Sequence, residues 1–129
     1  MRSTLPAASL GALIWSLSAS AVAGTLTTEA DGVQIEVRSE PETPVRDRKT
    51  TYIVRLADAA GKPVTDARVT LTGRMADGMS AAAPLRPSSE PGIYRGEVLF
   101  TMEGRWDLTV RVVSQGRRLE LPLHEEVGR

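Results

Sequence analysis

The sequence predicts an all-β fold, an antiparallel β-sandwich of about seven short strands after an N-terminal export signal. Three observations predict it. Apolar and polar residues alternate over several short runs, which is the spacing of a half-buried strand. Turn-forming Gly, Pro and Asp residues separate these runs. Beyond the first 23 residues, no stretch keeps the spacing of three and four that predicts a helix. A small closed barrel is the alternative architecture.

The stretch 92–113 carries the largest apolar side chains of the predicted domain. Its apolar residues share even numbers, and they are Tyr94, Val98, Phe100, Met102, Trp106, Leu108, Val110 and Val112. The odd positions between 97 and 111 are mainly charged. Because successive side chains of a strand point to opposite faces, this parity predicts one buried face. The link at 102–104 contains a glycine, so we predict a β-hairpin with Phe100 and Trp106 anchoring the core.

The strands that precede this stretch can be assigned in order. Residues 25–30 are predicted to form a short edge strand, and Asp31-Gly32 is a turn signal. Val33, Ile35 and Val37 alternate with polar residues, which predicts a half-buried strand. Residues 39–48 carry two prolines and many charges and are predicted to be a loop.

The next strand is predicted over residues 50–57, with Tyr52, Val54 and Leu56 on one face. Residues 58–71 then follow the pattern D-x-x-G-x-P-V-x-x-A-x-V-x-L, which resembles that of extracellular immunoglobulin-like modules. In it Gly61 and Pro63 form a turn, and the strand beyond points Val69 and Leu71 inward. The predicted sandwich is therefore immunoglobulin-like.

The remaining segments are two connections and one strand. Residues 74–91 show no strand pattern and are predicted to be a long connection, of the kind that is functional or disordered. Residues 114–117 are predicted to turn the chain into a last strand that contains Leu119, Leu121 and Leu123. Pro122 at an outward position places this strand at a sheet edge. Residues 125–129 are expected to fray.

Composition excludes several classes of function. The 129 residues contain 16 basic and 16 acidic residues, so no basic surplus is present to bind nucleic acid. Cysteine is absent, which excludes disulfides, thiolate metal sites and a cysteine nucleophile. The single histidine, His124, lies on the outward parity of its strand and is expected to be exposed. No nucleophile stands beside a base, so we predict that the protein is not an enzyme.

The N-terminus has the layout of a bacterial secretory signal. Met1-Arg2 gives a short positive start, residues 5–22 are mainly apolar, and Ala21-Val22-Ala23 is a small-x-small cleavage pattern. We predict a signal peptide at residues 1–23, with Trp15 inside it, and a periplasmic or secreted domain at residues 24–129. The alternative is an uncleaved helix that anchors the protein to the inner membrane; only then is membrane contact expected.

Three motifs carry a family resemblance. They are Met75-x-x-x-Met79, then Pro91-Gly92-x-Tyr94, then Phe100-x-Met102-x-Gly104-x-Trp106-x-Leu108-x-Val110. Together they resemble the YtkA-like domain, which is shared with the FixH proteins, over roughly residues 33–123. The resemblance implies a small β-sandwich in the cell envelope. FixH relatives are associated with a copper-transporting ATPase and with maturation of the cbb3 oxidase, so it also implies a role in metal handling.

Two methionines are the candidate metal ligands. Met75 and Met79 lie on one predicted loop, and their soft thioether sulfurs suit Cu(I), the one candidate cofactor. Met102 continues the inward parity and is predicted to be a core residue. In an up-and-down order of strands, loops alternate between the two ends of the sandwich. That alternation places Met102 at the opposite end from Met75 and Met79.

The same alternation predicts a partner-binding end made of residues 39–49, 74–91 and 114–117. The side chains most worth testing there, besides the two methionines, are Arg46, Arg48, Lys49 and Arg86. The predicted function is a non-enzymatic exported binding module of YtkA/FixH type. It would assist copper handling, or the assembly of an envelope metalloprotein or cation pump, through an envelope protein partner. The alternative is a purely structural or protein-interaction domain of immunoglobulin type with no metal.

Overall fold

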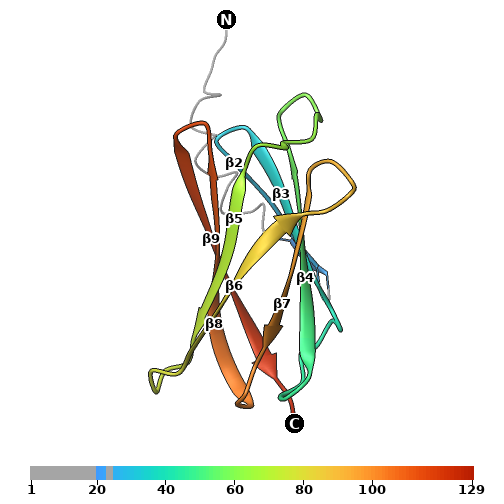
Figure 1. The fold of residues 1–129 in the computed structure, drawn as a ribbon. Coiled ribbons are helices and arrows are strands. Elements are labelled where there is room, and N and C mark those ends of the chain that lie inside the picture. Colours follow the sequence, from blue (N-terminus) through green and yellow to red (C-terminus); the bar gives the residue numbers. More distant parts are fainter. Residues whose placement is uncertain (1–19, 23–24) are drawn as a thin grey trace, which may run out of the picture.

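The computed structural model describes residues 20–22 and 25–129, so most of the predicted signal peptide, including Trp15, lies outside the described residues. The described part is all-β, as predicted, with nine strands and no helix (Figure 1). The strands are β1 (Ser20–Val22), β2 (Thr25–Ala30), β3 (Val33–Glu40), β4 (Lys49–Ala57), β5 (Arg68–Arg74), β6 (Ser80–Pro87), β7 (Ile93–Leu99), β8 (Gly104–Ser114) and β9 (Arg117–Val127).

No helix among the described residues is long and apolar enough to cross a membrane.

The strands form the two layers of a sandwich. Strands β1, β2, β3, β4 and β7 pair in that order and are called sheet I here, and strands β6, β5, β8 and β9 form sheet II. All the pairs are antiparallel. Strand β6 belongs to both layers, since its first residues pair with β5 and its last two, Arg86 and Pro87, pair with β7. One continuous ladder therefore runs through both sheets (Figure 1).

The early strands lie where the sequence predicts them. Strand β2 is the predicted edge strand, and in the described part its outer side carries only the three-residue β1. The Asp31-Gly32 pair turns the chain with both φ angles positive, at 52° and 79°. In β3 and β4 the residues predicted to face inward are buried, except that Val33 is half-buried, and Val69 and Leu71 in β5 are buried as well.

Strand β6 corrects the prediction that residues 74–91 form one long connection. Ala81, Ala83 and Leu85 alternate inward from Ser80 onward, with Ala83 and Leu85 each 4% exposed. The strand was missed because alanine gives a weak apolar signal and Pro84 lies inside the run. Its passage from one sheet to the other needs Gly96 in β7, where an added Cβ would lie 2.6 Å from the Pro84 carbonyl oxygen.

The predicted hairpin over residues 92–113 is also wrong, although the predicted inward parity is confirmed for all its apolar residues except Met102. Strand β7 pairs with β4 and β6, whereas β8 pairs with β5 and β9. The two strands lie in different sheets, and the link 100–103 carries the chain across the core. The inward residues of both strands share even numbers because both strands face the same interior, so parity alone cannot separate paired strands from facing ones.

The aromatic residues fill the space between the sheets. Tyr52, Tyr94, Phe100 and Trp106 are each at most 1% exposed, which confirms their predicted inward orientation. The ring of Phe100 lies 5.1 Å from that of Trp106 and 6.5 Å from that of Tyr52, in tilted and edge-on arrangements. Phe100 and Trp106 are therefore core anchors, as predicted.

Strand β9 is the predicted last strand, at the edge of sheet II, but residues 125–129 do not fray. Val127 is 4% exposed, and Gly128 pairs its backbone with the 44–46 segment of the loop that follows β3. The inward parity of Leu119, Leu121 and Leu123 simply continues through 125 and 127. Pro122 lies on the outer face and pairs in register with Thr109.

Candidate functional site at the methionine end

The candidate site is the end of the sandwich at the bottom of Figure 1, called the methionine end here. It is made of the loops 41–48 and 75–79, the link 100–103 and residues 128–129. The other end, called the Tyr94 end, carries the turn at 31–32, the loops 58–67 and 88–92, and the turn at 115–116.

Met75 and Met79 are joined through their backbones across a tight turn between β5 and β6. The Met75 N–H donates to the Met79 carbonyl at 2.8 Å, and the Gly78 N–H donates to the Met75 carbonyl at 3.0 Å. The Asp77 side chain accepts from the Met79 N–H at 3.0 Å. Met75 is half-buried against the core, whereas Met79 is 39% exposed. The turn therefore presents one anchored and one accessible thioether.

Met102 corrects a prediction, because its side chain is 39% exposed and it lies at the same end as Met75 and Met79. Phe100 is the last inward residue before the link, and the regular alternation stops there. The predicted opposite placement failed because β6 adds one chain reversal, which moves every later loop to the other end.

Two neighbours, Trp106 and Met75, hold the link 100–103 in place. The Trp106 indole N–H donates to the Met102 carbonyl at 3.0 Å. Gly104 has a φ of 120°, and an added Cβ there would lie 3.0 Å from the Met75 Cε atom. Glycine at 104 therefore lets the Met75 side chain reach the base of the Met102 link.

The basic residues predicted to bind a partner are only partly brought together. Arg46, Arg48 and Lys49 lie at the methionine end, but Arg86 lies where β6 meets β7, away from them. Residues 114–117 form the turn at the Tyr94 end, so the predicted grouping of three segments is wrong for this one. The extra reversal contributed by β6 is again the reason.

Acidic residues balance part of the charge at the methionine end. Arg46 lies 3.7 Å from a Glu103 carboxylate oxygen, and Arg129 lies 3.2 Å from the other one. Lys49 lies 3.6 Å from Glu97. Arg48 has no ion pair within the described part of the chain, which leaves it the freest of the predicted cations at this end.

A partly buried polar contact joins the two sheets beneath this end. The Tyr52 hydroxyl, from β4, donates to a Glu125 carboxylate oxygen of β9 at 2.8 Å. Burial raises the pKa of the Glu125 carboxyl above its ordinary value, and the hydrogen bond from Tyr52 lowers it in part. Burial and the neighbouring Glu125 raise the pKa of Tyr52 well above its ordinary range. Sequence reasoning assigned Glu125 to a solvated tail; the continued parity of β9 was the signal that could have found it.

The Gly-x-Tyr motif acts at the Tyr94 end and is structural. The Tyr94 hydroxyl donates to the Val64 carbonyl at 2.8 Å and accepts from the Ala67 N–H at 3.2 Å. Gly92 has a φ of 81°, and a Cβ there would lie 2.7 Å from the Pro63 Cβ. These contacts hold the β4–β5 loop onto the start of β7.

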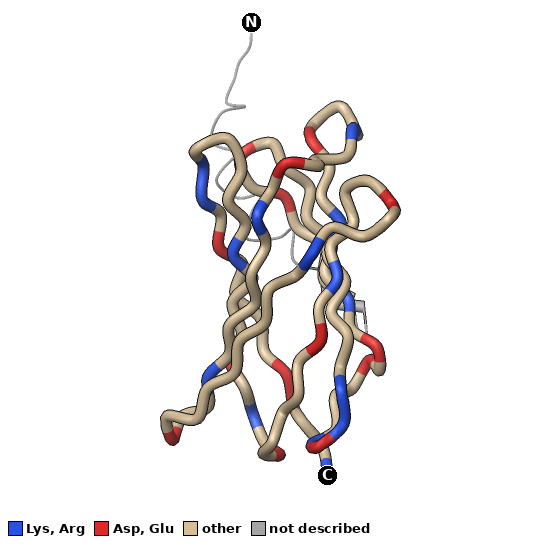
Figure 2. The backbone as a smooth tube through the Cα atoms, in the orientation of Figure 1, with Lys and Arg blue, Asp and Glu red and all other residues tan. Residues whose placement is uncertain are grey.

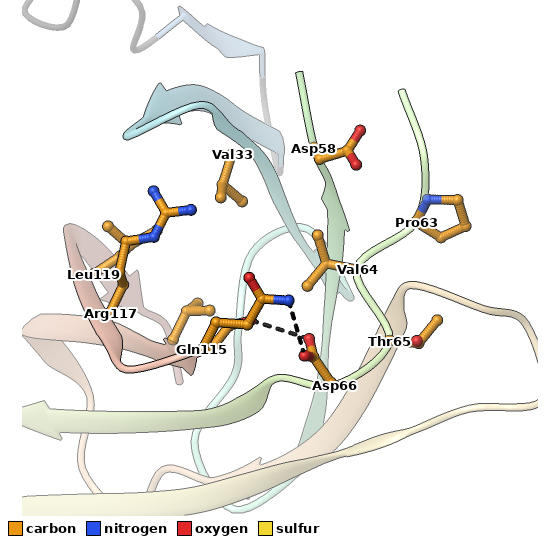
Figure 3. A pocket seen from close by; sticks show the side chains of 11 residues that line it. Val33, Asp58, Pro63, Val64, Thr65, Asp66, Gln115, Arg117 and Leu119 are labelled. Atoms are coloured by element: carbon orange, nitrogen blue, oxygen red, sulfur yellow. Dashed lines mark hydrogen bonds between the residues drawn. The ribbon is translucent and has the colours of Figure 1, made fainter. Parts of the chain in front are cut away.

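A cleft of about 300 Å³ opens at the Tyr94 end between the two sheets (Figure 3). Val33, Val64 and Leu119 contribute apolar surface to it. Its carboxylate at Asp66 accepts hydrogen bonds from Ser114 at 3.0 Å and Gln115 at 3.4 Å (Figure 3). Sequence reasoning did not foresee this cleft, because strands far apart in the chain supply its walls.

Harder metal ligands are not gathered in the described part of the chain, where no group of three or more His, Asp or Glu side chains could hold a metal ion. His124 is exposed, as predicted, and lies on the outer face of sheet II, 3.3 Å from a carboxylate oxygen of Asp107. The methionine thioethers are thus the soft donors that the described structure groups at one end.

The architecture defines an immunoglobulin-like β-sandwich, and two solved structures share it. A DUF4426 family protein from Pseudomonas aeruginosa superposes with a TM-score of 0.65 at 15% identity, covering 81% of this chain and 95% of its own. The filamin domain of Lin-41 superposes with a TM-score of 0.55 at 19% identity, covering 87% and 99%.

The family follows from the sequence itself. The model of the YtkA-like family matches residues 27–111, and the chain therefore belongs to that family. The comparison with curated proteins found no match.

Proposed function

We propose that this YtkA-like domain is a non-enzymatic exported binding module that carries Cu(I) at its methionine end. In this role it assists copper handling, or the assembly of an envelope metalloprotein or cation pump, as FixH relatives are expected to do. The observation that carries the proposal is the grouping of Met75, Met79 and Met102 at one end of a rigid sandwich.

The donor set fits the ion. Thioether sulfur is a soft ligand that selects Cu(I) over harder cations, and such a site needs two or three ligands that converge. Met75 and Met79 would hold the ion from their shared turn, with Met102 as the third donor. Met79 and Met102 are each 39% exposed, so an arriving ion or partner can reach them. Cu(I) is here a cargo, and exposed ligands suit transfer to a second protein.

The test is a Cu(I) titration of the full chain against a chromogenic chelator, under reducing conditions. We expect binding with a Kd of about 1 μM or tighter, weakened roughly tenfold or more in the Met75→Leu/Met79→Leu variant. Met102→Leu should give a smaller loss. His124→Ala is the matched control, because that side chain lies on the outer face of sheet II and should not matter.

Two results would remove the copper role: binding weaker than about 1 μM in the unaltered protein, or unchanged binding in the double methionine variant.

Export is part of the same proposal and has its own test. The predicted cleavage site after Ala23 leads us to propose a mature periplasmic or secreted protein that begins at Gly24. Mass spectrometry of the protein recovered from the periplasm or medium should give that N-terminus. Recovery of the intact chain in the membrane fraction would support the alternative, an uncleaved anchor in the inner membrane.

A second candidate is a protein-interaction domain that binds no metal. The observation that favours it is a pair of arginines on the outer face of sheet I, Arg86 and Arg95, which form no ion pair with any acidic side chain that the structure describes. The copper titration separates the two candidates, since the interaction domain should show no dependence on its methionines.

A further inference from the structure

The outer face of sheet I carries a row of arginines across its strands. Arg38 of β3 pairs in register with Ile53 of β4, Ile53 with Arg95 of β7, and Arg95 with Arg86 of β6. Figure 2 shows the cationic segments close together where β6 meets β7. Directly opposed residues of neighbouring strands place their Cβ atoms about 5 Å apart. Arg86 and Arg95 are thus two like charges held side by side.

The neighbouring cations of this face are balanced, and these two are not. Arg38 lies 3.9 Å from Glu40, and Arg55 lies 3.7 Å from Glu36. Among the described residues, no ion pair or side-chain hydrogen bond joins Arg86 or Arg95 to an acid. Like charges directly opposite each other destabilise a sheet. The arrangement therefore costs stability that an acidic ligand between the two guanidinium groups would offset.

The surface beneath the arginines is well packed. Ile53 belongs to the outer face by parity, yet it is 3% exposed. Its register neighbours are Arg38 and Arg95, and the aliphatic stems of such long side chains cover apolar surface while the charged heads stay in water. A covered isoleucine restrains the Arg95 stem, which lowers the entropy lost when its guanidinium group binds a ligand.

Strand β7 offers free backbone groups beside the pair. The Gly92 carbonyl accepts from Leu56 of β4, and the Ile93 carbonyl accepts from Ser88 on the opposite side. By alternation the backbone groups of Glu97 and Leu99 also point away from β4. Strand β6 pairs with β7 only at Arg95 and Tyr94, so no strand of the described part pairs with β7 beyond that point.

The same edge carries an exposed apolar side chain. Leu99 is 51% exposed, which is the highest value among the exposed large hydrophobic residues of the described part. Its side chain lies on the outer face, two residues beyond Glu97 and in register with Lys49. We define the β7 ledge as Arg86, Arg95, Glu97 and Leu99.

We propose that the β7 ledge docks an extended acidic segment of a partner protein. The segment runs along the edge of β7 where β6 no longer pairs with it. There it forms backbone hydrogen bonds with Glu97 and Leu99. An apolar side chain of the segment covers Leu99, and a carboxylate at its C-terminal side lies between Arg86 and Arg95. This surface adjoins the methionine end at Leu99, but it contains none of the methionines and its binding does not depend on copper.

The mixture of charges selects this occupant over an anionic membrane. Glu36, Glu40 and Glu97 lie on the same face as the arginines, and a uniformly negative surface would meet them as well. A single segment can place one carboxylate at the unbalanced pair and avoid the acids. Arginine forks also match carboxylate geometry in a bidentate manner.

The test uses a five-residue probe peptide, threonine-leucine-threonine-threonine-aspartate with a free C-terminal carboxylate, titrated into the isotope-labelled full chain. We expect saturable amide shifts at Glu97 and Leu99 in nuclear magnetic resonance spectra. The Arg86→Gln/Arg95→Gln variant should weaken binding roughly tenfold or more. Arg111→Gln is the matched control: Arg111 lies on the outer face of sheet II, 3.0 Å from Glu120, and its loss should leave binding unchanged.

A control peptide ending in asparagine amide should bind at least several-fold more weakly, because it lacks both carboxylates. The proposal is overturned by equal binding of the two peptides, by unchanged binding in the double arginine variant, or by absence of shifts at Glu97 and Leu99. It is also overturned if vesicles of phosphatidylglycerol bind the chain through Arg86 and Arg95 while the peptide does not.

Discussion

The two ends of the sandwich use their sequence motifs in different ways. At the Tyr94 end, Gly92 and Tyr94 are buried and locked onto the β4–β5 loop through close contacts and two hydrogen bonds. At the methionine end, Met79 and Met102 extend into water from a turn and a link that are themselves held firmly. One end therefore closes the fold, and the other presents side chains from a fixed base.

A family signature can therefore mix two kinds of residue. The glycine and tyrosine positions are explained completely by packing and backbone geometry. The exposed methionines have no comparable packing role, and the function proposed above assigns them to binding. Substitutions at the two ends should accordingly differ in how much stability they cost.

The largest loss is expected from Trp106→Ala. The indole is 1% exposed and supports the Met102 link through its N–H. The change should lower the free energy of unfolding by about 3–5 kcal/mol, measured by urea denaturation. Trp106→Phe is the control, since it retains much of the ring volume and should lose less. A loss below about 1 kcal/mol for the alanine variant would contradict the assignment of Trp106 as a core anchor.

Glycine substitutions give the sharpest comparison of the two ends. Gly92→Ala meets a φ of 81° together with contacts of 2.7 Å to Pro63 and 2.9 Å to the Leu56 carbonyl, so we expect a loss of about 2–4 kcal/mol. Gly78→Ala at the methionine end meets a φ of 97° but no atom within 4 Å, so strain alone should cost about 1 kcal/mol. Equal losses in thermal unfolding would remove the distinction between the ends.

Tyr94→Phe should cost about 1–2 kcal/mol, because the Val64 carbonyl and the Ala67 N–H both lose their hydroxyl partner. The ring itself stays, so the core volume is unchanged. Hydrogen exchange should show faster opening of the 58–67 loop in this variant. A stability equal to that of the unaltered protein would show that water replaces the hydroxyl without loss.

The smallest effect is a change of slope with pH near the methionine end. The pKa of Glu125 is raised in the folded state, so the folded protein binds its proton more tightly than the unfolded chain. The resulting stabilisation is present below the ordinary value of 4.5 and is lost as pH rises through the folded pKa. Glu125→Gln should therefore gain stability relative to the unaltered protein as pH rises.

Urea denaturation between about pH 4 and pH 7 measures this slope. Tyr52→Phe should steepen the loss, because the hydrogen bond that lowers the pKa of Glu125 disappears. The exposed neighbour Glu126, changed to Gln, serves as the control. If the Glu125→Gln variant loses stability relative to the unaltered protein as pH rises, the assigned direction of the pKa shift is wrong.

Much of the fold could be predicted from parity, because burial on one face requires alternation. The inward residues of β3, β4, β5, β8 and β9 were all predictable in this way. Pairing was not, since β7 and β8 show the same parity whether they pair or face each other. Strand β6 was not predicted because its alanines and Pro84 give no clear strand pattern. Its course depends on a close approach to Gly96, which no local pattern reveals.

The candidate site was harder to predict for the same physical reason. Omitting one strand moves every later loop to the opposite end, so Met102 was separated from Met75 and Met79, and the turn at 114–117 was placed beside them. The pairing of Arg86 with Arg95 depends on the register of a strand that sequence reasoning did not contain. Tertiary proximity of this kind is absent from any local pattern.

The path of β6 has a further consequence for how the molecule comes apart. Strand β6 is hydrogen-bonded to β5 over one part and to β7 over the other. Neither sheet can therefore separate from the other without breaking the backbone hydrogen bonds of β6. Heat or mechanical load should accordingly melt both halves in a single event. The methionine end should therefore keep its structure until the whole domain unfolds.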